Sequence, residues 1–225
     1  MTSLGKLVFI DQRTGDDDSY LTAEDQRLTL AYENLEEMPQ NLVYNFGSFV
    51  RILDLSHNKF RCLDFLCHFE NLSSLILDHN EVDSNVQFPS LPSLKLLWLN
   101  HNKIKDLFPF IRNLNNSVPN LKYLSLMGNA AAPSYLNGGT FYEYLQYRLF
   151  VISWFPNLIH LDDRVVSEDQ KNEAHRLFRR PFLERLSIST SRSSYLRVIQ
   201  EKFVSFFGSV ERYFPNAQNA RNTVI

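Results

Sequence analysis

The sequence predicts an α/β solenoid of short parallel strands, closed at its carboxy-terminal end by a helical cap. Five segments of the 225-residue chain repeat the frame L-x-x-L-x-L-x-x-N-x-L in full or in part, and this frame is typical of a leucine-rich repeat solenoid. The segments are residues 28–35, 50–60, 72–82, 94–104 and 121–131. The pattern then changes to an aromatic-rich stretch and a final half-frame, as expected of a capped end. We expect a right-handed solenoid whose strands line the concave face.

Each repeat is expected to supply one short strand with inward-pointing leucines, and one asparagine that bonds the backbone of neighbouring coils. The asparagines are Asn58, Asn80, Asn102 and Asn129. The fourth frame position marks each strand, and successive markers are 25, 22, 22 and 27 residues apart: Leu28, Leu53, Leu75, Leu97 and Leu124. Repeats this short favour 3₁₀ turns or extended segments over full helices on the convex side.

The chain divides into four parts. They are an N-terminal cap or flexible segment, the leucine-rich repeats, a carboxy-terminal cap and a tail, at residues 1–24, 25–131, 132–181 and 182–225. In the first part, residues 7–10 are apolar and are read as a strand that caps the first repeat. In the tail, residues 194–214 place apolar side chains at three-to-four spacing and predict an amphipathic helix.

The cap is expected to contain two helices. Residues 140–155 are dense in aromatics and long enough for a helix, and residues 156–163 repeat the L-x-x-L half of the frame a last time. Ser167 is followed three residues later by Gln170, which is the spacing of a capping box. A second helix should therefore begin there and run to about Arg179, before a proline.

Residues 119–178 carry more than a generic repeat. They contain LKYLSLMGN followed by an A-x-P step, then Y-x-x-Y-R-x-F-V-I with the pair Tyr147 and Arg148, and a closing P-x-L-x-x-L-D. These motifs resemble the carboxy-terminal cap of the intracellular leucine-rich repeat group, which includes the spliceosomal A-prime subunit, acidic nuclear phosphoproteins and axonemal proteins. Within that group the chain is most similar to the leucine-rich melanocyte differentiation-associated proteins, over about residues 70–178.

This resemblance implies a non-enzymatic adaptor in endosomal and lysosome-related organelle traffic. Its implied partners are a Rab-family small GTPase and the retriever-type sorting complex, and its implied location is the cytoplasm, with recruitment to endosomal or melanosomal membranes. The same cap occurs in proteins of other functions. Two alternatives therefore stay open: a ribonucleoprotein subunit like the spliceosomal A-prime protein, which holds an RNA-recognition-motif partner, and an axonemal or cytoskeletal scaffold.

Composition favours a soluble, intracellular monomer. The N-terminus lacks the basic start and apolar stretch of a secretory signal, and the longest apolar run, residues 149–155, is far shorter than the roughly 20 residues that span a bilayer. Two cysteines, Cys62 and Cys67, fit a thiol pair in a reducing compartment. The net charge of −2 gives no general attraction to phosphates, so we expect no direct contact with nucleic acid.

The predicted binding surface lies on the concave sheet. Frame positions three, five and seven point away from the core, because strand side chains alternate between faces. The residues that we expect to bind a protein are Ile52, Asp54, Ile76, Asp78, Leu96, Trp98, Asn100, Tyr123 and Met127. The apolar ones need a cover, because monomers rarely expose large apolar patches. We favour a protein partner anchored on Trp98 and Tyr123 over the chain's own helix at residues 194–214, although both together would make an autoinhibited switch.

His57, His79 and His101 precede the asparagines of successive repeats. Coils lie about 4.8 Å apart, so the three rings should form a row. Such a row fits metal binding or a response to pH, but no fourth ligand stands at a matching position, and we expect no metal site. The sequence also contains no G-x-S-x-G, no H-E-x-x-H and no phosphate loop, so we expect neither an enzyme nor a cofactor.

Overall fold

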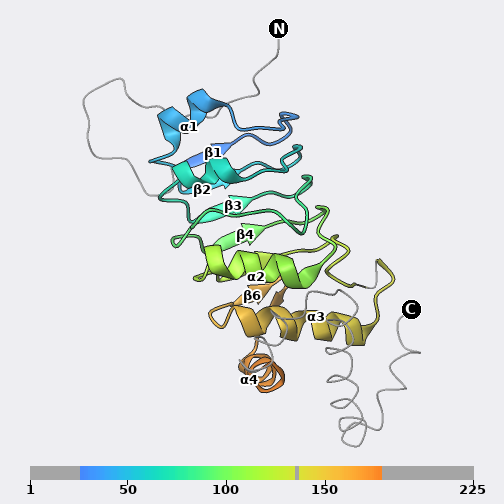
Figure 1. Cartoon of the computed structure of the whole chain (residues 1–225). Helices are drawn as coiled ribbons and strands as arrows, with labels where there is room; N and C mark the ends of the chain where they lie inside the picture. The colour runs from blue at the N-terminus through green and yellow to red at the C-terminus, as the bar shows by residue number, and fades with distance from the viewer. Residues whose placement is uncertain (1–25, 135–136, 179–225) are drawn as a thin grey trace, which may run out of the picture. The chain divides into compact units, whose positions relative to one another are not determined.

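The computed structural model describes residues 26–134 and 137–178 (Figure 1). The chain divides into two compact units, Met1–Lys171 and Asn172–Ile225, and nearly all of the described residues belong to the first. The strand expected at residues 7–10 and the tail helix expected at residues 194–214 lie outside the described residues.

One sheet runs through the described part of the first unit (Figure 1). Its strands follow each other in chain order, and the first six pair in parallel, whereas the last pairs antiparallel with its neighbour. The strands are β1 Arg27–Thr29, β2 Ile52–Asp54, β3 Ser74–Ile76, β4 Leu96–Trp98, β5 Tyr123–Ser125, β6 His160–Leu161 and β7 Arg164–Val165. The predicted α/β leucine-rich repeat architecture is confirmed.

The leucine at the fourth frame position sets the register of the sheet. The paired residues form one line across the strands: Leu28, Leu53, Leu75, Leu97, Leu124 and Leu161. All six are buried in the core. The line confirms the markers chosen from the sequence and shows that the half-frame before Asp162 adds a sixth coil.

The asparagines join neighbouring coils as expected. The amide of Asn58 donates to the carbonyl oxygens of Leu30 at 2.7 Å and Leu55 at 2.9 Å, and its Oδ1 accepts from the N–H of Leu35 at 2.9 Å. Equivalent bonds are made by Asn80, Asn102 and Asn129. Each side chain thereby satisfies backbone groups that the turn leaves without a ladder partner.

On the convex side, the two 22-residue repeats behave as predicted. One contains the 3₁₀ helix η1 Asp64–His68, and the other is extended, with a bridge between Asp83 and Lys103. The longer repeats differ from the prediction, since the helices α1 Gln40–Phe46 and α2 Leu107–Ser117 lie in them. The additional residues leave room for full turns, and α2 uses them to bury Phe110, Ile111 and Leu114.

The cap begins with the helix α3 Phe141–Trp154, within one residue of its predicted limits. Thr140 and Glu143 form a reciprocal capping box at its start, with the N–H of Glu143 donating to the Thr140 hydroxyl at 3.2 Å. Side-chain oxygens at this position satisfy N–H groups that lack helical partners. α3 packs beside α2 (Figure 1).

The helix α4 Glu168–Leu177 starts as the sequence predicts. The N–H of Gln170 donates to Ser167 Oγ at 3.2 Å, and the Gln170 side-chain oxygen accepts from the N–H of Ser167 at 3.4 Å. α4 begins in the first compact unit and ends in the second.

Candidate protein-binding face

Strand pairing brings the predicted binding residues together on one face of the sheet. At the third frame position the aligned residues are Ile52, Ser74, Leu96, Tyr123 and His160. At the fifth position they are Thr29, Asp54, Ile76, Trp98 and Ser125. Side chains at these positions point away from the leucine core, because the period along a strand is two residues. We call this surface the concave face.

Three large apolar side chains are exposed together at β4, at β5 and just after β5. Trp98 is 40% exposed, Tyr123 36% and Met127 42%. The Tyr123 ring stacks on His160, with centroids 5.5 Å apart, which holds the aromatic ring in place. Ile52, Ile76 and Leu96 are half-buried beside them. The predicted apolar surface is therefore present on rigid strands.

The expectation that Asp54 faces solvent is wrong. Asp54 is only 8% exposed, because Arg27 Nη2 on the neighbouring strand lies 2.8 Å from its Oδ2. Its Oδ1 accepts from the Ser56 hydroxyl at 2.8 Å. The pleat places Asp54 on the concave face, but a partner would meet the half-exposed guanidinium of Arg27 there.

Asp78 and Asn100 lie on the face but use part of their hydrogen-bonding capacity within the chain. Asp78 Oδ1 accepts from the N–H of Asn100 at 2.8 Å, and Asn100 Oδ1 accepts from the N–H of Met127 at 2.9 Å. Asn100 Oδ1 also accepts from the hydroxyl of Ser125 at 2.6 Å, which leaves Ser125 buried although its frame position predicted exposure. These bonds tie successive repeats together, so apolar contacts dominate what the face offers to a partner.

The histidine row is present and is longer than predicted. The ring centroids of His57 and His79 lie 4.2 Å apart, and those of His79 and His101 4.4 Å apart. Tyr32 extends the row, with its ring 4.0 Å from His57. Its position, four residues after Leu28, is the frame position of the histidines and was the available sequence signal.

The surroundings of the histidine row favour the neutral form of His79. Desolvation by the surroundings lowers the pKa of His79 below its ordinary value, and the charges on His57 and His101 lower it further, while Asp78 opposes them. No group of three or more His, Cys, Asp or Glu side chains in the described segments is placed to hold a metal ion.

A polar network is buried in the cap. The Tyr147 hydroxyl donates to Asp162 Oδ1 at 3.2 Å, and the same oxygen accepts from the N–H of Leu126 at 2.9 Å. Burial raises the pKa of both side chains, that of Tyr147 well above its usual value. The sequence singled out Tyr147 and Arg148 but missed Asp162, whose carboxylate bonds the preceding coil much as the asparagines do.

No family model matches the chain. The chain is 41% identical over 121 residues to the human leucine-rich melanocyte differentiation-associated protein. This match spans 53% of the chain and 61% of the human protein, less than two thirds of that relative. The sequence-based resemblance to these proteins is confirmed.

A solved structure shares the fold, and a second is less similar. In a crystal structure of the Drosophila melanogaster SNF/U2A' complex, one chain matches with a TM-score of 0.57 and 23% identity, over 76% of this chain and 92% of that one. An internalin of Listeria monocytogenes matches with a TM-score of 0.37 and 16% identity, over 60% and 46% of the two chains. In the described part of the chain, no helix is both long and apolar enough to cross a membrane.

Proposed function

We propose that this protein is a non-enzymatic adaptor whose concave face captures a protein partner. The exposed cluster of Trp98, Tyr123 and Met127 on paired strands is the observation that carries the proposal. Aromatic residues and methionine are enriched at protein interfaces, and tryptophan and tyrosine are frequent anchors of binding energy. Because the cluster sits on a hydrogen-bonded sheet, little conformational freedom is lost on binding.

The polar surroundings of the cluster fit recognition rather than chemistry. Asp54, Asp78 and Asn100 each accept hydrogen bonds from the chain itself. Their geometry ties repeats together and offers no paired acid and base beside a hollow. A partner with an apolar segment, bordered by groups that can meet Arg27 at one end, would complement this face.

The partner that we propose is a Rab-family small GTPase, with the retriever-type complex as a further partner. The cellular setting would be the cytoplasmic side of endosomes or melanosome-type organelles. The support is the 41% identity over 121 residues to the human leucine-rich melanocyte differentiation-associated protein, beside the resemblance of the cap motifs quoted above. The protein would act as a monomer, without nucleic acid or cofactor.

A ribonucleoprotein role is the second candidate. The SNF/U2A' crystal structure contains a complex, and its matching chain is covered over 92% of its length by the fold described here. In that case the concave face would hold an RNA-binding protein, and the chain itself would need no contact with RNA. An axonemal or cytoskeletal scaffold is a third candidate, supported by the resemblance of the cap.

Nucleotide-dependent pull-down separates these candidates. Full-length protein is incubated with Rab-family GTPases loaded with either GDP or a non-hydrolysable GTP analogue. The switch segments of such GTPases are ordered by γ-phosphate contacts, so a trafficking adaptor should bind one loaded state in preference to the other. Equal recovery of both states, together with recovery of splicing proteins from lysate, would overturn the trafficking proposal in favour of the ribonucleoprotein role.

A further inference from the structure

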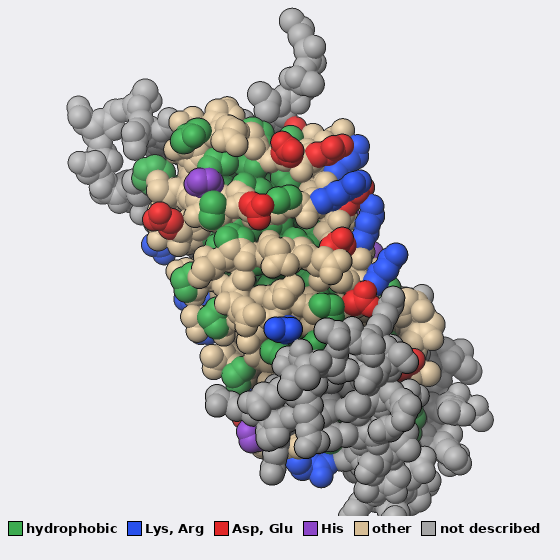
Figure 2. Space-filling model, viewed as in Figure 1, with side chains coloured by type: hydrophobic (Ala, Val, Ile, Leu, Met, Phe, Trp, Pro, Cys, Tyr) green, Lys and Arg blue, Asp and Glu red, His purple; other side chains and the backbone are tan. Residues whose placement is uncertain are grey.

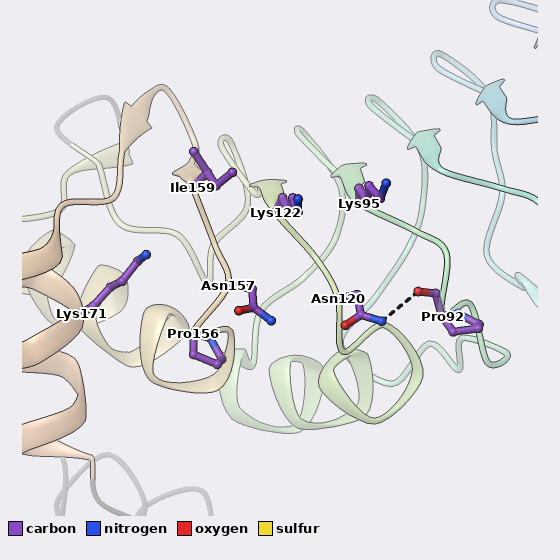
Figure 3. A pocket seen from close by; sticks show the side chains of 8 residues that line it. All are labelled: Pro92, Lys95, Asn120, Lys122, Pro156, Asn157, Ile159 and Lys171. Atoms are coloured by element: carbon purple, nitrogen blue, oxygen red, sulfur yellow. Dashed lines mark hydrogen bonds between the residues drawn. The ribbon is translucent and has the colours of Figure 1, made fainter. Parts of the chain in front are cut away.

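A hollow lies beside the loops that lead into β4, β5 and β6 (Figure 3). Its volume is about 500 Å³, which is within the range of small-molecule sites. Three lysines, two asparagines, two prolines and one isoleucine line it: Pro92, Lys95, Asn120, Lys122, Pro156, Asn157, Ile159 and Lys171. The amide of Asn120 donates to the carbonyl oxygen of Pro92 at 3.0 Å and so fixes one side of the hollow.

Two of the lysines lie on adjacent coils of the solenoid. The N–H of Lys122 donates to the carbonyl oxygen of Lys95 at 2.8 Å, and the N–H of Ile159 donates to that of Lys122 at 2.8 Å. Backbone segments joined by such hydrogen bonds lie about 4.8 Å apart. Both lysines are exposed and occupy the same frame position, just before a strand. Their ammonium groups therefore lie on the same side of the solenoid, where the strands begin. Like charges on neighbouring coils repel each other.

On the opposite side of the solenoid, where the strands end, basic residues of successive repeats are neutralised by an acidic residue of the chain itself. Arg61, Glu81 and Lys103 come from three successive repeats, and Glu81 in the middle one forms ion pairs with both basic residues, the one to Lys103 at 2.9 Å. The hydrogen bond from Lys103, followed by that from Arg61, lowers the pKa of the Glu81 carboxyl. Figure 2 shows such acidic and basic side chains next to each other along one edge of the repeats.

The lysine-lined hollow has no equivalent of Glu81. None of its eight lining residues is acidic, and neither Lys95 nor Lys122 makes an ion pair with any residue that the structure describes. Lys171 reaches toward the hollow from α4 and is paired with Glu168 at 2.9 Å (Figure 3). The positive charge of this side is therefore left for a ligand to balance.

We propose that the hollow between Lys95, Lys122 and Lys171 is a binding site for a multiply charged phosphate group, separate from the concave face. Lysine acts on phosphate as a point charge, whereas planar carboxylates are matched best by the fork of an arginine, and no arginine lines the hollow. The amide of Asn157 adds a neutral donor beside the lysines, and Pro156 and Ile159 supply an apolar wall. The phosphate is that of a soluble inositol phosphate or of the matching lipid headgroup.

The test is titration calorimetry of the full chain with inositol hexakisphosphate at fixed ionic strength. The variant Lys95→Gln with Lys122→Gln should bind roughly thirtyfold more weakly, since each lysine near a phosphate surface contributes a factor of about five. The matched control is Lys59→Gln with Lys105→Gln, which removes two exposed lysines from the opposite side and changes the net charge equally. This control should bind as wild type does.

A parallel experiment separates the two sources of phosphate. Flotation with phosphatidylcholine vesicles that carry phosphatidylinositol bisphosphate should recover the wild type but not the Lys95→Gln and Lys122→Gln variant if the source is the headgroup. Binding of inositol hexakisphosphate without flotation would assign the site to a soluble ligand, and the phosphate site would stand. Equal weakening in both double variants, or no binding by the wild type, would overturn the proposal. Neither result depends on the partner of the concave face.

Discussion

Arg148 donates a hydrogen bond from Nη1 to the carbonyl oxygen of Leu161 over 2.8 Å, although the residue is only 1% exposed. Its Nη2 donates to the carbonyl oxygen of Val165 at 3.1 Å and to the side-chain oxygen of Gln170 at 3.1 Å. One buried cation therefore joins α3 to β6, β7 and the first turn of α4. The ring of Tyr144 faces the guanidinium at 5.9 Å and shields it further from water.

Arg148→Met should destabilise the protein by about 2–5 kcal/mol. Methionine retains much of the apolar length but leaves the buried carbonyl of Leu161 and the part-buried carbonyl of Val165 without this donor, and a buried group left unsatisfied costs roughly 1–3 kcal/mol. Urea unfolding of the full chain measures the change. Arg112→Met, an exposed position on α2, is the control, and a loss no greater than that of the control would contradict a structural role for the buried cation.

Gly128→Ala should be more damaging than Gly138→Ala. Both glycines have positive φ, +76° and +81°, so alanine carries a backbone cost at each. At Gly128 a Cβ would also lie 2.4 Å from Nδ1 of His101, whereas at Gly138 it would meet nothing within 4 Å. We expect Gly138→Ala to cost about 1 kcal/mol and Gly128→Ala at least 1 kcal/mol more, in line with overpacking.

Thermal and urea unfolding of the two glycine variants provide the comparison. Adding His101→Gly to Gly128→Ala removes the ring that the new methyl group would meet, and glycine tolerates the positive φ of this position, so part of the loss should be recovered. Equal losses at Gly128 and Gly138 would show that the end of the ring row is not tightly packed.

The pKa of His79 should lie below its ordinary value of 6.5. Desolvation is the first cause, and the positive charges of His57 and His101 add to it. Because the folded pKa is the lower one, the unfolded chain binds more protons as pH falls below 6.5, and stability is lost as pH falls toward the folded value. Above 6.5 this contribution is fully present.

Imidazole titration by nuclear magnetic resonance checks this expectation directly. His57→Asn removes one charged neighbour, and asparagine tolerates the positive φ of this position. In this variant the pKa of His79 should rise toward 6.5. A titration of His79 that is the same in both proteins would show that the rings do not interact electrostatically.

The register of the sheet was predictable because core packing requires a leucine at the same frame position in every repeat. Leu28 and Leu53, 25 residues apart, pair directly, as do Leu75 and Leu97 at a spacing of 22. The helix α2 was not predicted, because repeat length alone favours shorter turns, whereas α2 is stabilised by burial of Phe110, Ile111 and Leu114. Local spacing thus determined the strands but not the convex side.

The residues of the proposed binding face were predicted in position on the sheet but not in solvent accessibility. The two-residue period assigned both Asp54 and Trp98 to the concave side, which the structure confirms. It gave no information on neighbours, and Arg27 covers Asp54 by an ion pair across strands that are far apart in sequence. For the same reason Asp162 was missed, since its contact with Leu126 spans 36 residues.

The proposed function requires that the concave face around Trp98 binds the protein's partners. Quantitative proximity labelling in cells, with wild type, Trp98→Ala and Tyr44→Ala, measures this binding. Tyr44 is 82% exposed on α1 and serves as the matched aromatic control. An interface anchor contributes about 2 kcal/mol or more, so Trp98→Ala should lose the specific labelling while Tyr44→Ala retains it, and both should melt close to wild type. Unchanged labelling by Trp98→Ala, or unfolding of that variant, would contradict the role of Trp98 as an anchor for partners on the concave face.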